Sequence, residues 1–297
     1  MTASGTTPTP ATTAATATAY VRAGERGAAA EPRARFRDLV AAEWIKLRSL
    51  RSVRIAHAAT ALAVIAFNAG TAWDIHSHWS ERDAAGRDAF VRDGMPLQTA
   101  FTGNAAMIMA LALAAIGALV IVGEYGTGTN RTTFAAVPAR HSVMAAKAAV
   151  LALTATAFGA FVAGTSFALT QAILDGHGAG VSPGAPGALR VVLASALLAP
   201  VCALAGLAVG AALRHTAAAM TASVAVVLVL PLVFTDTRHW SAVAGHTLPY
   251  RAWLRLVDTG HGPEPFPWTT GGAWTVYAVW ACAACALAVA CTHRRDQ

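Results

Sequence analysis

Residues 191–234 read VVLASALLAPVCALAGLAVGAALRHTAAAMTASVAVVLVLPLVF, and their only charged side chain is that of Arg214. About 20 consecutive apolar residues in a helix are enough to cross the hydrocarbon core of a bilayer. The stretch therefore predicts two membrane-spanning helices, Val191–Leu213 and Ala217–Phe234, joined by a tight turn. A soluble fold would leave too much of this apolar surface exposed to water.

The rest of the chain repeats this pattern. Hydrophobic residues make up 56% of the 297 residues and charged residues only 12%, about half the charged share of an average soluble domain. Four more apolar blocks predict spans at Ile55–Trp73, Phe101–Val122, Ala148–Leu169 and Trp274–Cys291. Long single blocks favour helices over barrel strands, because a spanning backbone must satisfy its own hydrogen bonds. We expect an all-α, polytopic membrane protein with six transmembrane helices.

The basic residues predict the orientation of these helices. Fifteen of the 22 Lys and Arg residues lie before the first span, in 123–147, in the 214–216 turn or after the last span. Loops rich in Lys and Arg stay in the cytoplasm, so we expect a multi-pass protein of the cell (plasma) membrane with both termini cytoplasmic. A net charge of +7 could also suggest nucleic-acid binding. The basic residues flank the apolar blocks and form no single patch, so we expect no nucleic-acid partner.

The segments outside the six-span domain (55–291) have distinct compositions. Residues 1–32 are rich in Thr and Ala and predict a disordered tail. Residues 33–54 place apolar residues at helical spacing beside basic ones, which predicts an amphipathic cytoplasmic helix on the membrane lipids. That helix is either a plain anchor or a segment that transmits force from a partner. We expect an outer loop at 235–273, in which 241–257 can be helical, and a cytoplasmic tail at 292–297.

The sequence contains no recognisable energy source. The predicted span cores lack Asp, Glu, Lys and Arg, the residues on which ion-coupled carriers depend. GEYGTGTN at 123–130 has the glycine spacing of a phosphate loop, but Thr129 and Asn130 replace its Lys and its Ser or Thr. We therefore expect no catalytic activity, no cofactor and no nucleotide site in this chain. Any uphill transport would need ATP hydrolysis by another chain.

Other chemistry-bearing residues give weak signals. Cys282 and Cys285 form a C-x-x-C inside the last predicted span, where packing is the simplest role. His76, His78 and Asp74 lie in a polar loop, and their spacing does not favour a metal site. Gly206 and Gly210 form a G-x-x-x-G in the fourth predicted span. Such glycines allow close helix packing, either within the subunit or at a dimer seam.

Two segments share a pattern with a known family. Residues 123–147 read GEYGTGTNRTTFAAVPARHSVMAAK and include a short helix that begins at a Thr and stops at Pro138. Residues 43–49, before the first span, read EWIKLRS, and the only two lysines of the chain, Lys46 and Lys147, fall in these two segments. Together the segments resemble those of ABC-2-type exporter permeases, the transmembrane subunits of bacterial ABC transporters.

The resemblance implies a fold, a role and partners. It implies an ABC-2-type exporter fold and a permease that pairs with a second permease subunit, as a homo- or heterodimer. It also implies a separate ABC ATPase subunit, on which loop 123–147 docks as a coupling helix. The residues implied for the coupling loop are Gly123, Glu124, Tyr125, Gly128, Thr129, Arg131, Thr133, Arg140 and Lys147. Those implied for the interfacial helix are Glu43, Trp44, Lys46 and Arg48.

A purely structural role is the alternative to coupling in this loop. In that case Gly123–Gly128 only caps a helix and forms a turn, and Glu124 pairs inside its own subunit. The uncharged span cores favour an apolar or amphipathic solute, such as a drug, a lipid-like molecule or a peptide, as the cargo of an ATP-driven export. The alternative function is a non-transporting membrane anchor or sensor that recruits a cytoplasmic partner. An ion-coupled carrier is a third hypothesis.

Overall fold

The computed structural model describes residues 35–137, 139–259 and 266–294. The chain divides into two units, Met1–Arg35 and Phe36–Gln297, and the helices of the described residues belong to the second. The predicted tail at 1–32 lies outside the described residues. The predicted C-terminal tail at 292–297 lies partly outside them, and the last helix continues to Arg294.

The described residues form helices and no strand. The helices are α2 (Phe36–Ser49), α3 (Arg51–Ser77), α4 (Ala84–Arg92), α5 (Met95–Ala100), α6 (Gly103–Thr127), α7 (Thr129–Ala136), α8 (Arg140–Asp175), α9 (Ala188–Leu213), α10 (Thr216–Val224), α11 (Leu230–Val233), α12 (His239–His246), α13 (Pro249–Val257) and α14 (Thr270–Arg294). A 3₁₀ turn, η1 (Trp79–Glu81), follows α3, and a π-helical segment, η2 (Ala225–Val229), joins α10 to α11.

Six helical segments are long and apolar enough to cross a membrane, and all six predicted spans fall within them or overlap them closely. The segments are Arg51–Ser77, Met95–Thr127, Arg140–Asp175, Ala188–Leu213, Thr216–Val233 and Thr270–Cys291. This result confirms the all-α class and the multi-pass membrane protein. At 1.5 Å per residue, the 36 residues of α8 extend for about 54 Å. That length exceeds the roughly 30 Å hydrocarbon core, so part of α8 continues beyond the membrane.

Two predicted boundaries differ from the structure. The interfacial helix predicted over 33–54 ends at Ser49, and Arg51 starts the first spanning helix after an extended residue, Leu50. The loop predicted over 123–147 is mostly helical, because α6 continues to Thr127 and α8 already begins at Arg140. Neither flanking stretch, 123–127 or 140–147, contains a proline that would stop its helix.

The fifth span changes its helix type ahead of a proline. α10 passes into the π-helical η2, and α11 follows with Pro231 in its first turn. Proline has no N–H and its ring crowds the preceding turn, and one wide turn relieves that crowding. Pro200, by contrast, lies inside an uninterrupted α9.

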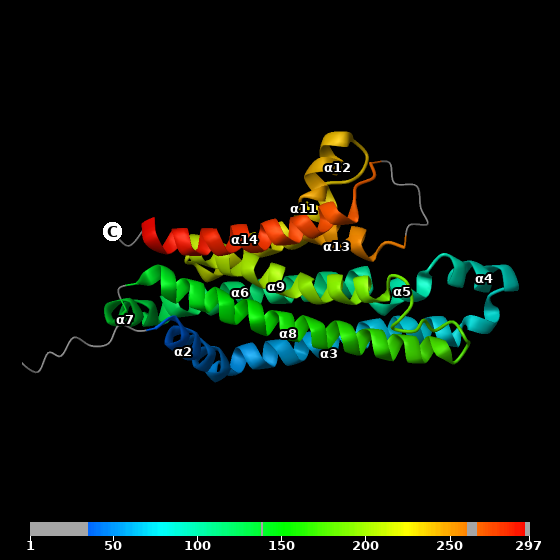
Figure 1. Ribbon diagram of the computed structural model, residues 1–297, viewed down its shortest axis with the longest axis horizontal. Helices are drawn as coiled ribbons and strands as arrows, with labels where there is room; N and C mark the ends of the chain where they lie inside the picture. The colour runs from blue at the N-terminus through cyan, green and yellow to red at the C-terminus, as the bar shows by residue number, and fades with distance from the viewer. Residues whose placement is uncertain (1–34, 138, 260–265, 295–297) are drawn as a thin grey trace, which may run out of the picture. The chain divides into compact units, whose positions relative to one another are not determined.

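The core lies around α9, which packs against α6, α8 and α14 (Figure 1). A Cβ added at Gly206 would lie 1.9 Å from the carbonyl oxygen of Ala114 on α6, and one at Gly210 would lie 2.6 Å from Cγ2 of Ile121. The two glycines of the G-x-x-x-G therefore let α9 approach α6 closely. This face is covered within the chain, so it cannot form the dimer seam.

A buried polar group fixes α3 to its neighbours. Asn68 is fully buried, and its Oδ1 accepts hydrogen bonds from the backbone N–H and the hydroxyl of Thr102, each at 3.0 Å. Its Nδ2 donates to Oγ of Ser166 on α8 at 3.2 Å. Thr102 is also the N-cap of α6. The Asn68 amide thus has hydrogen-bond partners for both its oxygen and its nitrogen, and it joins α3 to α6 and α8.

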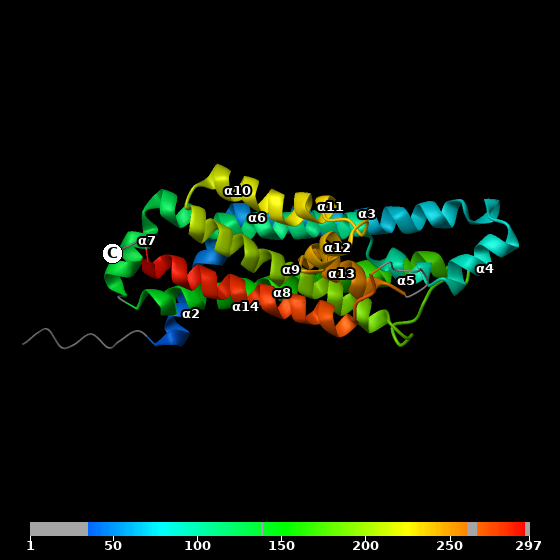
Figure 2. The same ribbon diagram turned by 90° about the horizontal axis from the view of Figure 1, so that it is seen from above.

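The predicted helix over 241–257 is two helices, α12 and α13. They meet at Thr247 and Leu248, because Pro249 is well suited to start a helix but not to continue one. α13 packs against α9 and α14 (Figure 2). Its Trp253 and Leu256 side chains are buried.

Candidate functional site

Two ends of the bundle hold the candidate sites. α2, α7 and the C-terminal end of α14 lie at one end, which we call the α2–α7 end (Figures 1 and 2). α5 and α13 lie towards the opposite side, which we call the α5–α13 end. The segments singled out by the family resemblance are all at the α2–α7 end.

Four charged side chains meet at the α2–α7 end. Lys147 on α8 donates to Oε2 of Glu43 on α2 and, at 2.6 Å, to Oε1 of Glu124 on α6. Lys46 Nζ lies 2.7 Å from Glu43 Oε1 and 3.7 Å from Glu124 Oε1. We call these residues the four-charge cluster. It joins α2 to both helices that flank α7.

The four-charge cluster is buried and electrically balanced. The side chains of Lys147, Glu43 and Glu124 are 3%, 5% and 15% exposed, and that of Lys46 is 32% exposed. Two positive and two negative charges compensate one another, as buried charges require. A compact ammonium fits between two carboxylates, and the void beside the cluster is only about 20 Å³. The two lysines of the cluster are the only lysines in the sequence.

α7 contacts the four-charge cluster through Thr133. Lys46 Nζ lies 3.5 Å from the hydroxyl oxygen of Thr133, and that hydroxyl donates to the carbonyl of Thr129 at 2.9 Å. Gly128 separates α6 from α7. Its φ of +73° is a left-handed backbone conformation that residues other than glycine rarely adopt. α7 is thus a short helix after a glycine turn, and among its described side chains Thr133 contacts Lys46 of α2.

The last turn of α6 also has a second contact, on Tyr125. The guanidinium of Arg214 lies 4.7 Å from the centre of the Tyr125 ring, within the range of a cation–π interaction. Arg214 Nη2 donates to the carbonyl of Cys291 on α14 at 3.2 Å. Glu124 and Tyr125, adjacent in sequence, therefore join α6 to two different groups of helices. The sequence pattern marks Arg214 only as part of a turn and does not predict this contact.

The other residues singled out at this end are more peripheral. Gly123 is exposed at the end of α6, and Thr129 shares a 2.8 Å hydroxyl contact with Thr127. Arg140 begins α8, and Arg131 lies in α7 with its side chain outside the described part. Trp44 is exposed, and the Arg48 guanidinium lies 5.8 Å from its ring centre. The structure thus brings together Glu43, Lys46, Glu124, Thr133 and Lys147.

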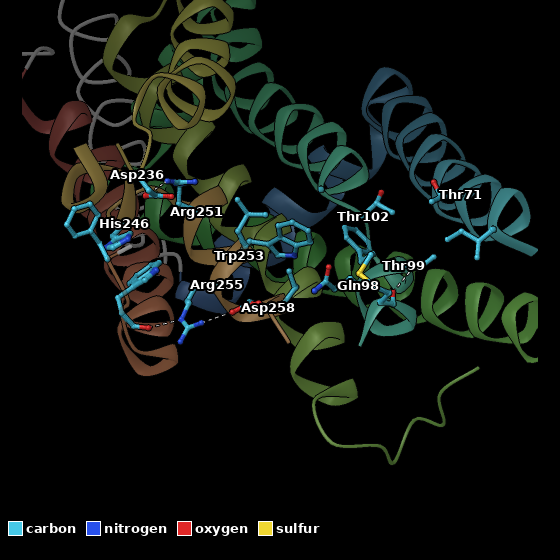
Figure 3. A pocket seen from close by; sticks show the side chains of 18 residues that line it. Thr71, Gln98, Thr99, Thr102, Asp236, His246, Arg251, Trp253, Arg255 and Asp258 are labelled. Atoms are coloured by element: carbon cyan, nitrogen blue, oxygen red, sulfur yellow. Dashed lines mark hydrogen bonds and ion pairs between the residues drawn. The ribbon is translucent and has the colours of Figure 1, made fainter. Parts of the chain in front are cut away.

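A cavity of about 530 Å³ lies at the α5–α13 end (Figure 3). Arg251 Nη2 lies 2.5 Å from Asp236 Oδ1, and Arg255 Nη1 lies 2.8 Å from Asp258 Oδ2. Trp253 is also part of the lining and is almost fully buried. For this region the sequence predicts an outer loop in which 241–257 can be helical, and no local pattern in it indicates a cavity.

Two residues at the α5–α13 end, Tyr250 and His78, have raised pKa values. Burial raises the pKa of the Tyr250 phenol, so the hydroxyl remains a donor to the carbonyl of Gly103 at 3.3 Å. The pKa of His78 is raised, chiefly because its ring is bonded to the backbone carbonyl of Asp74, and further by the carboxylates of Glu81 and Asp74. Within the described residues, no group of three or more His, Cys, Asp or Glu side chains is arranged to hold a metal ion.

The sequence matches no protein-family model and no curated protein. The likeness to ABC-2-type permeases therefore rests on the residues of the two segments alone. The class shown by the fold is a multi-pass, all-helical membrane protein.

Proposed function

We propose that the chain is the transmembrane permease subunit of an ATP-driven, ABC-2-type exporter. In this proposal a separate ABC ATPase binds at the α2–α7 end, a second permease subunit completes the translocation path, and the cargo is an apolar or amphipathic solute. In this proposal the spans cross the plasma membrane, and the α2–α7 end faces the cytoplasm. The basic flanks of the helices at this end support that orientation.

The observation that carries the proposal is the four-charge cluster. It joins α2, α6 and α8, and α6 and α8 are also the two helices between which α7 is held. An ATPase that displaces α7 would act on both of these spanning helices through their ends. Buried, balanced charges suit such a connection, because separating them would leave desolvated charges unpaired.

The coupling role of Glu124 is then indirect. Glu124 bonds to Lys147 within its own chain and is largely buried. The surface offered to the ATPase is α7, and Glu124 with Tyr125 passes its movement to α8 on one side and to α9, α10 and α14 on the other. Thr129 and Thr133 of α7 are positioned at the start of this route.

Co-purification tests the proposal. Full-length chain with an affinity tag, isolated from the membranes of its own host in mild detergent, should retain a protein with a phosphate loop and ATPase activity. Adding back the chain to that ATPase should change its rate of ATP hydrolysis several-fold. An ATPase absent from the complex, or one whose rate ignores the chain, would overturn the proposal.

Variants then separate coupling from binding. Glu124→Gln should keep the ATPase bound but reduce the change in its rate about tenfold, because it removes one carboxylate of the four-charge cluster. Arg37→Gln is the matched control, since Arg37 is an exposed cation on α2 outside the cluster. The two variants should reach the membrane in equal amounts. If the chain is a non-transporting anchor, its partner should stay bound in every variant, and the chain should not change the partner's rate of ATP hydrolysis in the first place.

A further inference from the structure

The cavity at the α5–α13 end is large enough for a ligand. Its volume of about 530 Å³ falls within the roughly 300–1,000 Å³ of small-molecule sites. Its walls come from α3, from α5 and the start of α6, and from residues within 236–258 and 266–268. Figure 3 shows both arginine–aspartate pairs on one side of the cavity and Thr71 of α3 on the other.

The charges in the lining are balanced and half-buried. Arg251 with Asp236 and Arg255 with Asp258 give two cations and two anions, so the four together are neutral. The Asp236 bond uses one of the five N–H donors of the Arg251 guanidinium. Because the lining is neutral, a ligand whose net charge has a single sign gains no net electrostatic attraction from it. A ligand that has separate positive and negative groups can engage a guanidinium and a carboxylate together.

Aromatic rings supply the complementary surface. The Trp253 indole is 1% exposed and its Nε1 donates to Ser195 Oγ at 3.0 Å, so it supports the lining and presents almost no face to a ligand. The Trp268 and His246 rings stack with centroids 4.4 Å apart and planes at 8°. Trp268 is partly exposed, and the indole face that His246 does not cover can attract an ammonium group, quaternary ones included. The cavity thus combines donors for an anion with carboxylates and ring faces for a cation.

The α3 wall gives the cavity an apolar side. Ile75 lies in this wall, and the Thr71 hydroxyl is already bonded to the Phe67 carbonyl at 3.0 Å, so it presents mainly its methyl group. α3 is among the least buried of the six spans. Its wall is therefore the one next to the lipid-facing surface, where an acyl chain would continue from a headgroup in the cavity.

We propose that this cavity binds the headgroup of a zwitterionic amphiphile, with a phosphate at the arginines and an ammonium at the aspartates and the Trp268 ring. Arg251 and Asp236 form the specific pair, and the acyl chain leaves along α3. Binding requires neither the ATPase nor the export proposed above. The two proposals can therefore fail separately.

Native mass spectrometry of the full-length chain in dodecyl maltoside tests this site. Lysophosphatidylcholine should bind once and saturably, about tenfold more tightly than lysophosphatidylglycerol of the same chain length. Glycerophosphocholine, which has the headgroup without the chain, distinguishes a membrane amphiphile from a soluble zwitterion and should bind at least tenfold more weakly. If glycerophosphocholine bound as tightly as lysophosphatidylcholine, the proposal of an amphiphile would be overturned and the cavity would be assigned to a soluble ligand.

Paired substitutions locate the binding. Arg251→Gln with Asp236→Asn should weaken lysophosphatidylcholine about tenfold. Arg92→Gln with Asp93→Asn is the matched control, because that exposed pair lies outside the cavity, and it should leave the affinity unchanged. Arg251→Lys keeps the charge but loses the planar fork, so it should weaken binding several-fold and serves if the double variant does not fold. Equal binding of the two lysolipids, or affinity unaffected by either Arg251 variant, would overturn the proposal.

Discussion

At the α2–α7 end, four charged side chains surround a void of about 20 Å³, whereas at the α5–α13 end four charged side chains border a cavity of about 530 Å³. The pairs differ in what they connect. Besides the local pair Glu43–Lys46, Lys147 joins separate helices by reaching Glu43 across 104 positions of sequence and Glu124 across 23. At the α5–α13 end Arg251 and Asp236 are 15 positions apart, and Arg255 and Asp258 are three apart. Long-range pairs fix helix ends together. Local pairs stiffen one wall and leave the space beside it open.

The largest effect is expected from Lys147→Met at the α2–α7 end. This variant leaves Glu43 and Glu124 buried with Lys46 as their remaining cation. Removing one member of a buried ion group costs about 3–5 kcal/mol in the free energy of unfolding. The Tm of the purified chain in detergent, followed by tryptophan fluorescence, should fall by about 6 °C or more.

A charge-matched variant distinguishes ionic pairing from packing. Lys147→Met combined with Glu43→Gln removes one charge of each sign, so its loss of stability should be smaller than the sum of the two single losses. Strict additivity, or a single variant as stable as the parent, would contradict the view that this end is held by its charges.

A somewhat smaller effect is expected at the α6–α9 contact, on which both ends depend. Gly206→Ala would place a Cβ 1.9 Å from a backbone oxygen of α6, and the helices must separate to relieve it. Overpacking of this kind costs about 1–3 kcal/mol. Gly164→Ala on α8 is the control, since nothing lies within 4 Å of its added Cβ, and it should stabilise by up to about 1 kcal/mol. Equal Tm values for the two variants would mean that α6 and α9 do not depend on this close approach.

At the α5–α13 end, Arg251→Gln should change stability little. The pair with Asp236 is partly exposed, and pairs of this kind contribute at most about 1 kcal/mol because solvent screens them. Tm should therefore fall by no more than about 3 °C. A loss as large as that of Lys147→Met would erase the contrast between a closed end and an open one.

The spans were predictable because long apolar blocks need no partner to be recognised. Val191–Leu213 lies within α9, and Ala217–Phe234 matches the α10–α11 span to about one residue at each end. The four-charge cluster was only partly predictable. Lys46 and Lys147 were conspicuous as the only lysines, but their meeting depends on how α2, α6 and α8 pack, which no local pattern contains.

The cavity could not be predicted for a related reason. Arg251 and Arg255 lie four positions apart on α13, which would place them on one helix face. The break between α12 and α13 and the docking of Trp253 on Ser195 decide what that face encloses. These are contacts between segments distant in sequence. The family resemblance of the α2–α7 end stays a prediction, which co-purification with an ATPase tests.

The smallest expected effect is a pH dependence beside the α5–α13 end, at His78. Its pKa is raised in the folded chain by the Asp74 carbonyl, which lies 2.9 Å from Nδ1, and by the Glu81 and Asp74 carboxylates. The folded state therefore binds the proton more tightly than the unfolded state, and this stabilisation is present below the unfolded pKa of about 6.5. It is lost as the pH rises through the folded pKa.

His78→Gln should lower Tm at pH 5.5 by a degree or so and leave it unchanged at pH 8.5. Glu81→Gln should reduce that difference, because it removes one of the carboxylates that favour the protonated ring. A His78→Gln effect that grows with pH would have the wrong sign, and the ring would then be stabilising the fold through its neutral form.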